Sequence, residues 1–113
     1  MSETKNFCFG LEKKRYVTCG IRDRMPIEYQ VLMWQWIDAL VLEQGNADYL
    51  QVFSFFLEET KGKKMQVIEH HQEVPEHKVK YTMEPLAEVV VGTVFVIDDG
   101  EGGCCTMLWS DEY

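Results

Sequence analysis

The segment from Pro26 to Leu42, PIEYQVLMWQWIDALVL, constrains the fold of this chain more than any other stretch. It is the one long run in which apolar residues recur at the spacing of an α-helix. Pro26 suits the first helical position, because its ring fixes φ near the helical value and its missing N–H would be unpaired there. Gly45 follows as a left-handed helix stop. The segment therefore predicts one main helix, at about residues 26–42.

This predicted helix is apolar around more of its circumference than a single sheet can cover. At about 100° per residue, one apolar stripe comprises Ile27, Val31, Trp34, Ile37 and Val41. A second stripe beside it comprises Tyr29, Met33, Trp36 and Leu40. A helix that covers a sheet needs only one stripe, so the first is assigned to the core. The second stripe then fills a large core within the chain or forms an interaction surface for a homodimer or another protein.

Most of the remaining chain consists of short segments rich in β-branched and aromatic residues, which are typical of strands. The predicted strands cover residues 16–19, 48–59, 65–74, 78–83, 89–98 and 104–109, and residues 21–25 read as a polar link. Short turns join most of them, which favours antiparallel neighbours. The pattern predicts an α+β fold in which one main helix packs on an antiparallel sheet of about five to six strands.

The strand at residues 48–59 carries apolar side chains on both of its faces. Leu50, Val52 and Phe56 lie on one face, and Tyr49, Phe53, Phe55 and Leu57 lie on the other. Parallel or central strands that are covered on both sides have this pattern. We therefore expect this strand in the middle of the sheet, with both faces covered for part of its length.

A length of 113 residues fits one domain with a core of its own. Residues 1–14 begin polar and contain the aromatic residues Phe7 and Phe9. We expect them to form a flexible N-terminal arm that docks through its aromatic side chains. Residues 15–113 are expected to form the single domain. At the other end, Leu108 and Trp109 are expected to complete the core as the end of a strand; the alternative is that residues 110–113 form a docking peptide.

The formal net charge of -8 argues against a general binder of nucleic acid or of anionic membranes, since both would repel the chain. An acidic decoy of a nucleic-acid-binding protein remains as an alternative. Residues 1–10 lack the apolar segment of a signal peptide, and residues 89–97 are much shorter than the roughly 20 residues that span a bilayer. A cytoplasmic location is expected, so Cys8, Cys19, Cys104 and Cys105 are interpreted as free thiols. Cys104 and Cys105 should point to opposite faces of a strand.

All three histidines lie within residues 69–77, EHHQEVPEH. His71 and His77 could meet across a bend at Pro75, with Glu73 supplying the carboxylate of a two-histidine, one-carboxylate metal site. A solvated polar strand face is the favoured interpretation, because His70 and His71 point to opposite sides of a strand. A small metal- or thiol-dependent enzyme that uses residues 70–77 remains an alternative.

No residue is assigned a catalytic role from the sequence, and no cofactor is expected. Asp38 falls within the first apolar stripe of the helix. We expect its carboxylate at the edge of that stripe, bonded to a backbone N–H or a tyrosine hydroxyl, since a catalytic carboxylate needs a partner with a matching role.

Several segments resemble one protein family in the same order along the chain. They are RYVT at 15–18, IEYQVLMWQWID at 27–38, DYLQVF at 48–53, QEVPEHKVKY at 72–81, VIDDG at 96–100, and TML with a terminal DEY. The chain is thereby identified as resembling domain of unknown function 960, small proteins of Gram-positive bacteria that often lie in mobile-element or phage-like gene neighbourhoods. Trp109 and Ser110 stand where the family pattern has an aliphatic pair. The resemblance implies no reaction, cofactor or catalytic residue, and we expect a non-enzymatic interaction or accessory protein.

Overall fold

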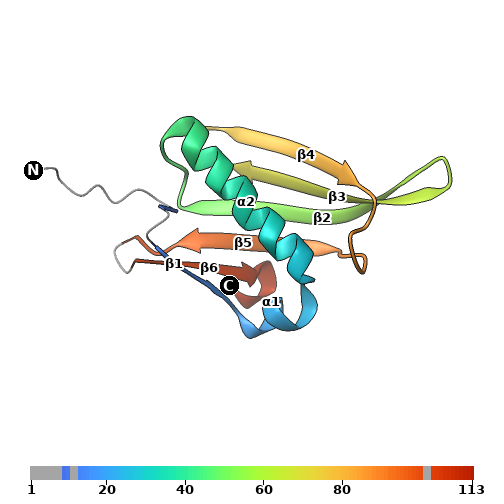
Figure 1. The fold of residues 1–113 in the computed structure, drawn as a ribbon, viewed down its shortest axis with the longest axis horizontal. Helices are drawn as coiled ribbons and strands as arrows, with labels where there is room; N and C mark the ends of the chain where they lie inside the picture. Colours follow the sequence, from blue (N-terminus) through green and yellow to red (C-terminus); the bar gives the residue numbers. More distant parts are fainter. Residues whose placement is uncertain (1–8, 11–12, 101–102) are drawn as a thin grey trace, which may run out of the picture.

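The structure, a computed structural model, describes residues 9–10, 13–100 and 103–113. Within them, six strands form one sheet in the order β1-β6-β5-β2-β3-β4 (Figure 1). Their bounds are Lys14–Val17 for β1, Leu50–Thr60 for β2, Lys63–Gln72 for β3, His77–Met83 for β4, Gly92–Asp98 for β5 and Cys104–Trp109 for β6. Neighbouring strands are antiparallel except β1, which pairs with β6 in parallel. The predicted α+β class is confirmed, and β2 is central between β5 and β3.

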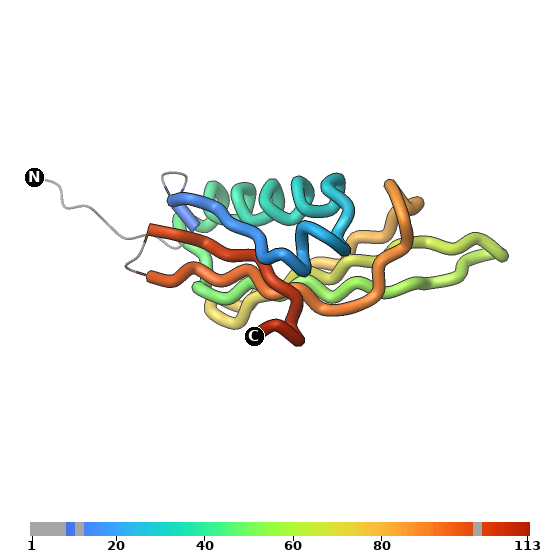
Figure 2. The backbone as a smooth tube through the Cα atoms, turned by 90° about the horizontal axis from the view of Figure 1, so that it is seen from below, coloured from blue at the N-terminus to red at the C-terminus, as the bar shows by residue number. Residues whose placement is uncertain are grey.

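The main helix, α2, spans Ile27–Gln44 and covers one face of the sheet (Figures 1 and 2). It ends at Gly45 in the left-handed conformation, with φ 81°, as the sequence predicts. A short helix, α1, spans Cys19–Arg24, where a polar link was expected. That prediction was wrong because the N-cap was missed: the Thr18 hydroxyl accepts a hydrogen bond from the Ile21 N–H. A 3₁₀ turn, η1, spans Ser110–Glu112.

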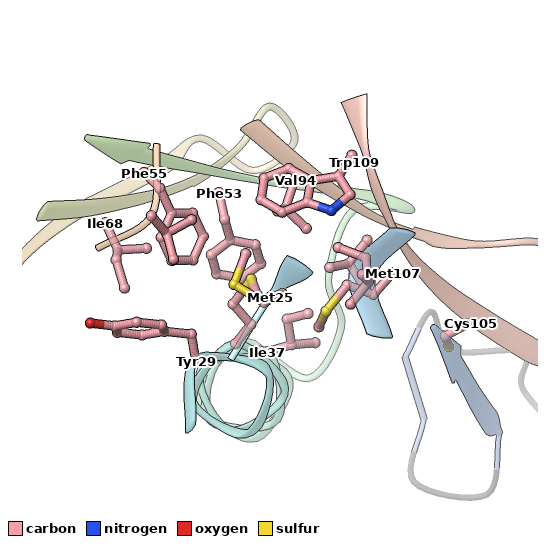
Figure 3. Packing of buried hydrophobic residues seen from close by; sticks show 14 of the residues in the cluster. Met25, Tyr29, Ile37, Phe53, Phe55, Ile68, Val94, Cys105, Met107 and Trp109 are labelled. Carbon is pink, nitrogen blue, oxygen red and sulfur yellow. The ribbon is translucent and has the colours of Figure 1, made fainter. Parts of the chain in front are cut away.

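The buried side of α2 consists of Tyr29, Met33 and Leu40 of the second stripe together with Ile37 of the first, and not of the first stripe as expected. Tyr29, Met33 and Leu40 are buried against the sheet, while Ile27 and Val31 of the first stripe are 63% and 46% exposed. Figure 3 shows Tyr29 together with Ile37 on the helix side of the core, facing Phe53 and Val94 of the sheet. The assignment of the first stripe to the core was wrong. Both stripes are apolar, so periodicity alone does not show which side of the helix meets the sheet.

The predicted interaction surface of Tyr29, Met33, Trp36 and Leu40 is therefore corrected: these side chains belong to the core or its border. The Tyr29 hydroxyl accepts a hydrogen bond from the Leu86 N–H at 2.9 Å. Trp36 is partly buried and stacks on Tyr81 of β4, with ring centroids 3.9 Å apart. Through these contacts, Tyr29 holds α2 to the loop after β4, and Trp36 holds it to β4 at the edge of the sheet.

A buried ion pair anchors the segment before β1. The Asp98 carboxylate, at the end of β5, accepts hydrogen bonds from the Phe9 N–H at 2.7 Å and the Lys13 ammonium at 2.9 Å. Burial raises the pKa of Asp98, but the bonds from Lys13, Phe9 and Gly100 outweigh it and hold the pKa below its usual value. Phe9 is itself buried in the core, and β1 starts at Lys14, inside the predicted arm. The rest of that arm, residues 1–8 and 11–12, lies outside the described residues.

The C-terminal residues are held against α1. Trp109 is buried and its indole N–H donates to the Gly20 carbonyl at 3.0 Å. The Glu112 carboxylate accepts from the Trp109 N–H and from the Thr18 hydroxyl, each at 2.8 Å. The first of these bonds, followed by the second, holds the pKa of Glu112 below its usual value. Leu108 and Trp109 thus end a strand that is part of the fold, as the sequence favours.

Replacing Gly92 by alanine should destabilise the fold, because φ at Gly92 is +145° and an added Cβ would lie 2.9 Å from Cζ3 of Trp109. The positive φ and the clash together should lower the free energy of unfolding by at least about 2 kcal/mol. Urea denaturation measures this. The control is Gly62→Ala, where φ is +75° and no atom lies within 4 Å of the new Cβ. Equal losses in the two variants would show that the Trp109 contact is not what requires glycine at position 92.

Candidate functional site

Two neighbouring hollows lie where β3 turns into β4. The larger, of about 350 Å³, is lined by His71, Gln72, Glu73, Glu76, His77 and Lys78. The smaller, of about 90 Å³, is lined by Asp48, Tyr49, Leu50, Val52, His71, Gln72 and Glu73. Three residues line both, so the hollows share a wall formed by the end of β3.

Side chains from the start of β2 hold this turn in place. The Asp48 carboxylate accepts from the backbone N–H of Glu73 at 3.3 Å and of Val74 at 3.1 Å. The Gln72 side-chain carbonyl accepts from the Asp48 N–H at 2.9 Å, and its amide donates to the Pro75 carbonyl at 2.7 Å. The turn is therefore fixed by hydrogen bonds to side chains that are themselves anchored in the sheet, which limits how far the lining residues can move.

His70 is the most unusual titratable group near the turn, because it is buried, with 1% of its surface exposed. Its Nε2 lies 2.6 Å from the side-chain oxygen of Gln51. The Gln51 amide nitrogen already donates to the Asp48 carbonyl and to Gln72, so its oxygen is the acceptor. His70 consequently carries its proton on Nε2, and Nδ1 finds no hydrogen-bond partner among the described residues.

The ring of His70 belongs to a row of aromatic contacts. It stacks on Phe53 at 4.3 Å between centroids and meets the edge of His77 at 5.3 Å. Burial chiefly, and then the neighbouring His77 and His71, lower the pKa of His70 to about 3. His70 is therefore a neutral core side chain at physiological pH, and its ring connects the α2 side of the sheet to the turn.

The predicted metal ligands come near one another but do not form a site. His71, His77 and Glu73 all line the larger hollow. Yet no group of three or more His, Cys, Asp or Glu side chains within residues 9–10, 13–100 and 103–113 is placed to hold a metal ion. The strand register explains this: His77 pairs with Gln72 and shares its face of the sheet, so His71 lies on the opposite face. The two-histidine, one-carboxylate geometry is thus contradicted.

The thiols and Asp38 lie away from these hollows. Cys105 is buried, and burial, followed by the nearby Asp98 carboxylate, raises its pKa to about 12, so it is not a nucleophilic thiolate. Cys104, its neighbour, is half-buried on the opposite face of β6, as predicted. Asp38 pairs with the Arg15 guanidinium, which also lies 4.8 Å from the Trp34 ring. The expected partner of Asp38, a backbone N–H or a tyrosine, was therefore wrong.

A second candidate site is the face of the sheet that α2 does not cover. Among the residues that the structure describes, Figure 2 shows α2 on one side of the sheet and the C-terminal segment on the other. The strand register places an apolar group on this uncovered side, which we call the open face, formed by Tyr16, Leu50, Val52, Phe95, Ile97 and Leu108. Antiparallel sheets with one wet face normally carry polar residues there. The same side also carries Ser54, Thr93 and Thr106, so the open face is an apolar group on a side of mixed polarity.

The open face is shielded only in part by its own chain. Tyr113 meets the edge of Phe95 at 5.8 Å but is itself 81% exposed. Tyr16 is 50% exposed, Leu50, Val52, Phe95 and Ile97 are half-buried, and Leu108 is buried. The sequence contains a signal for this site, since residues 48–59 are apolar on both faces. From this pattern we expected a strand that is covered on both sides.

The buried, neutral state of His70 predicts a pH dependence of stability. Its pKa is about 3 in the folded chain and 6.5 when exposed, so the unfolded chain binds more protons between these values. Its stabilising contribution is complete above pH 6.5 and is lost as the pH falls towards 3. The free energy of unfolding should fall by up to about 1.4 kcal/mol per pH unit from this residue.

Urea denaturation between pH 7 and pH 4 measures how steeply the free energy of unfolding changes with pH, and this slope can be compared between variants. His70→Gln cannot titrate and should flatten the slope relative to the wild-type chain. His71→Gln, at the half-exposed neighbour, is the control and should keep it. An unchanged slope in His70→Gln would show that His70 is not held neutral by the fold.

The comparisons with known proteins agree with this fold. The profile of the family described as "Staphylococcal protein of unknown function (DUF960)" matches residues 14–112. A solved structure described as a protein of unknown function from Enterococcus faecalis is similar, with a TM-score of 0.72 and 20% sequence identity over 98% of each chain. No curated protein matches. No helix among the described residues has the length and apolar character needed to cross a membrane. The chain belongs to the family of staphylococcal proteins of unknown function named domain of unknown function 960.

Proposed function

We propose that this protein is a non-enzymatic interaction domain whose binding surface is the open face of its sheet. The observation that carries the proposal is the apolar side of β6, β5 and β2 that faces away from α2. A large contiguous apolar patch on the surface of a small domain marks a protein interaction site or a ligand-binding groove. A partner that covers this face would complete a second core layer on the free side of the sheet.

The surroundings of the open face have the arrangement of a protein interface. Its centre carries no charged side chain, and charged groups stand on the strands around it: Lys14 on β1, Glu58 on β2, Lys63 and Glu69 on β3, and Lys78 and Lys80 on β4. An apolar centre within a polar rim is the usual organisation of protein–protein interfaces. Lys80 and Glu58 are paired at 3.0 Å, so part of this rim is already neutralised.

The outer side of α2 is a weaker candidate surface. Ile27, Val31 and Leu42 are exposed there, but Gln35 and the Asp38–Arg15 pair lie among them. Apolar side chains that are scattered singly on a surface are normal and need no partner. The interaction surface that the sequence placed on the helix is thus better placed on the opposite side of the molecule, on the sheet.

The enzyme alternative has less support. It required a pocket that joins His71 or His77 to a thiol or to Asp38, and the larger hollow is lined by neither. For the acidic decoy, the strand positions around the open face offer two glutamates beside four lysines, which is a poor mimic of a phosphate backbone. More specifically, we propose that this interaction domain is an accessory protein of a bacterial or mobile-element system. A cytoplasmic location goes with it, in line with Cys19 and Cys105 being free thiols.

Val52→Glu tests the proposal, because it places a charge in the centre of the open face without entering the core under α2. Immobilised variant protein should capture far less of any partner from a lysate of the host bacterium than the wild-type chain does. Val31→Glu makes the same change on the exposed side of α2 and should capture as much as the wild type. Circular dichroism confirms that both variants fold. Equal capture by Val52→Glu and the wild type would rule out the open face as the binding surface.

A further inference from the structure

We propose that the partner of the open face is a second copy of this chain, packed sheet against sheet about a two-fold axis that runs parallel to the strands. The inference rests on the proposed function and names its partner. Two copies related by a two-fold axis present the same surface patch to each other, so one apolar face is enough to make the interface.

The shape of the open face favours an identical partner. Stacked sheets pack about 10 Å apart with their strands within about 30° of each other, and this angle arises from the twist of each sheet. A second copy has the same strand number and the same twist, so the two surfaces stay in contact along their whole length. Centrally placed Val52 and Phe95, which are paired neighbours on β2 and β5, would meet their counterparts near the axis.

The whole open side of the sheet, which is the open face with its charged surroundings, is close in size to what a stable dimer needs. Strands lie about 4.8 Å apart and rise about 3.4 Å per residue, so six strands of roughly seven residues present roughly 700 Å² before side-chain relief is counted. A standard stable interface buries about 800 Å² on each partner. A smaller peptide would leave part of the apolar face uncovered, whereas a second sheet covers it all.

The charge distribution also selects this side of the molecule for self-association. The whole chain has a formal net charge of -8, so two copies repel each other over most of their surface. The strand positions on the open side carry four lysines, Lys14, Lys63, Lys78 and Lys80, and two glutamates, Glu58 and Glu69, and the C-terminal segment on the same side adds Asp111 and Glu112. The open side is therefore close to neutral, and it is where two like-charged molecules approach with the least repulsion.

The direction of the axis follows from the position of the lysines. Lys78 and Lys80 are both on β4, at one edge of the sheet. An axis perpendicular to the strands would place β4 of one copy on β4 of the other and bring like charges together. An axis parallel to the strands places β4 over β6 and β1 of the partner. There the half-exposed ring of Tyr16 offers its face to a lysine ammonium.

The first test is the mass of the chain in solution. Sedimentation equilibrium of the wild-type protein, at concentrations up to about 1 mM, should show twice the mass of the chain. Val52→Glu should raise the dissociation constant at least about 30-fold, as expected for a central position of an interface. Ile97→Lys should do the same with the opposite charge, and Val31→Glu, on α2, should dissociate as the wild type does.

The second test concerns the axis, with Cys8, Cys19 and Cys104 replaced by serine. A short thiol-reactive cross-linker should join Tyr16→Cys to Lys78→Cys when the two single variants are mixed. It should join few molecules when Lys78→Cys is present alone. Efficient cross-linking of Lys78→Cys to itself would overturn the parallel axis.

The outcomes distinguish the claim that the partner is a second copy from the claim that the open face is a binding surface. A wild-type chain that stays monomeric at the highest concentration, or a dimer that Val52→Glu and Ile97→Lys leave intact, overturns the second-copy inference. If the chain is monomeric and Val52→Glu still loses partners captured from the lysate, the proposed function stands with a different occupant. If Val52→Glu loses neither self-association nor captured partners, both proposals fall.

Discussion

The fold depends on the burial of one side of α2 against one face of the sheet. Tyr29, Met33, Ile37 and Leu40 supply the helix side, and Phe53, Phe55, Val94 and Met107 supply the sheet side. A helix about 10 Å across can cover only part of a six-stranded sheet, and only from one side. The whole arrangement follows from this limit: the core has two layers, and whatever apolar residues lie beyond them are left at the surface or at its border.

The edges of the two-layer core are completed by polar groups rather than by more apolar ones. On β5, Asp98 holds Lys13 and the Phe9 N–H. At the same end of the strands, on β2 and β3, Gln51 and Gln72 connect His70 to the turn between β3 and β4. Buried polar side chains are tolerated when their hydrogen bonds are satisfied. The hydrogen bonds of Gln51 and Gln72 hold the turn between β3 and β4 in place. The histidine segment therefore lines an open hollow with side chains of both charges and does not form a metal site.

The open face is the consequence that bears on function. The residues of β2 alternate between the two sides of the sheet, and both sets are apolar. One set meets α2, and the other meets no element of comparable size in the described residues. A second sheet is the simplest way to bury a flat apolar surface, because sheets stack with matching twist. This reasoning connects a pattern in one strand to a surface that a partner of the same shape would cover.

Sequence by itself determined the helix, its stop at Gly45, the strand segments, the α+β class and the family. These follow from periodicity, from glycine in a left-handed position and from β-branched content, all of which act locally. It also showed that α2 and β2 are each apolar on two sides. Only the tertiary structure decided which stripe of α2 meets the sheet and which face of β2 stays open. It alone paired β1 with β6 in parallel and placed His71 and His77 on opposite faces. Those choices depend on contacts between residues far apart in the chain, and local patterns carry no information about them.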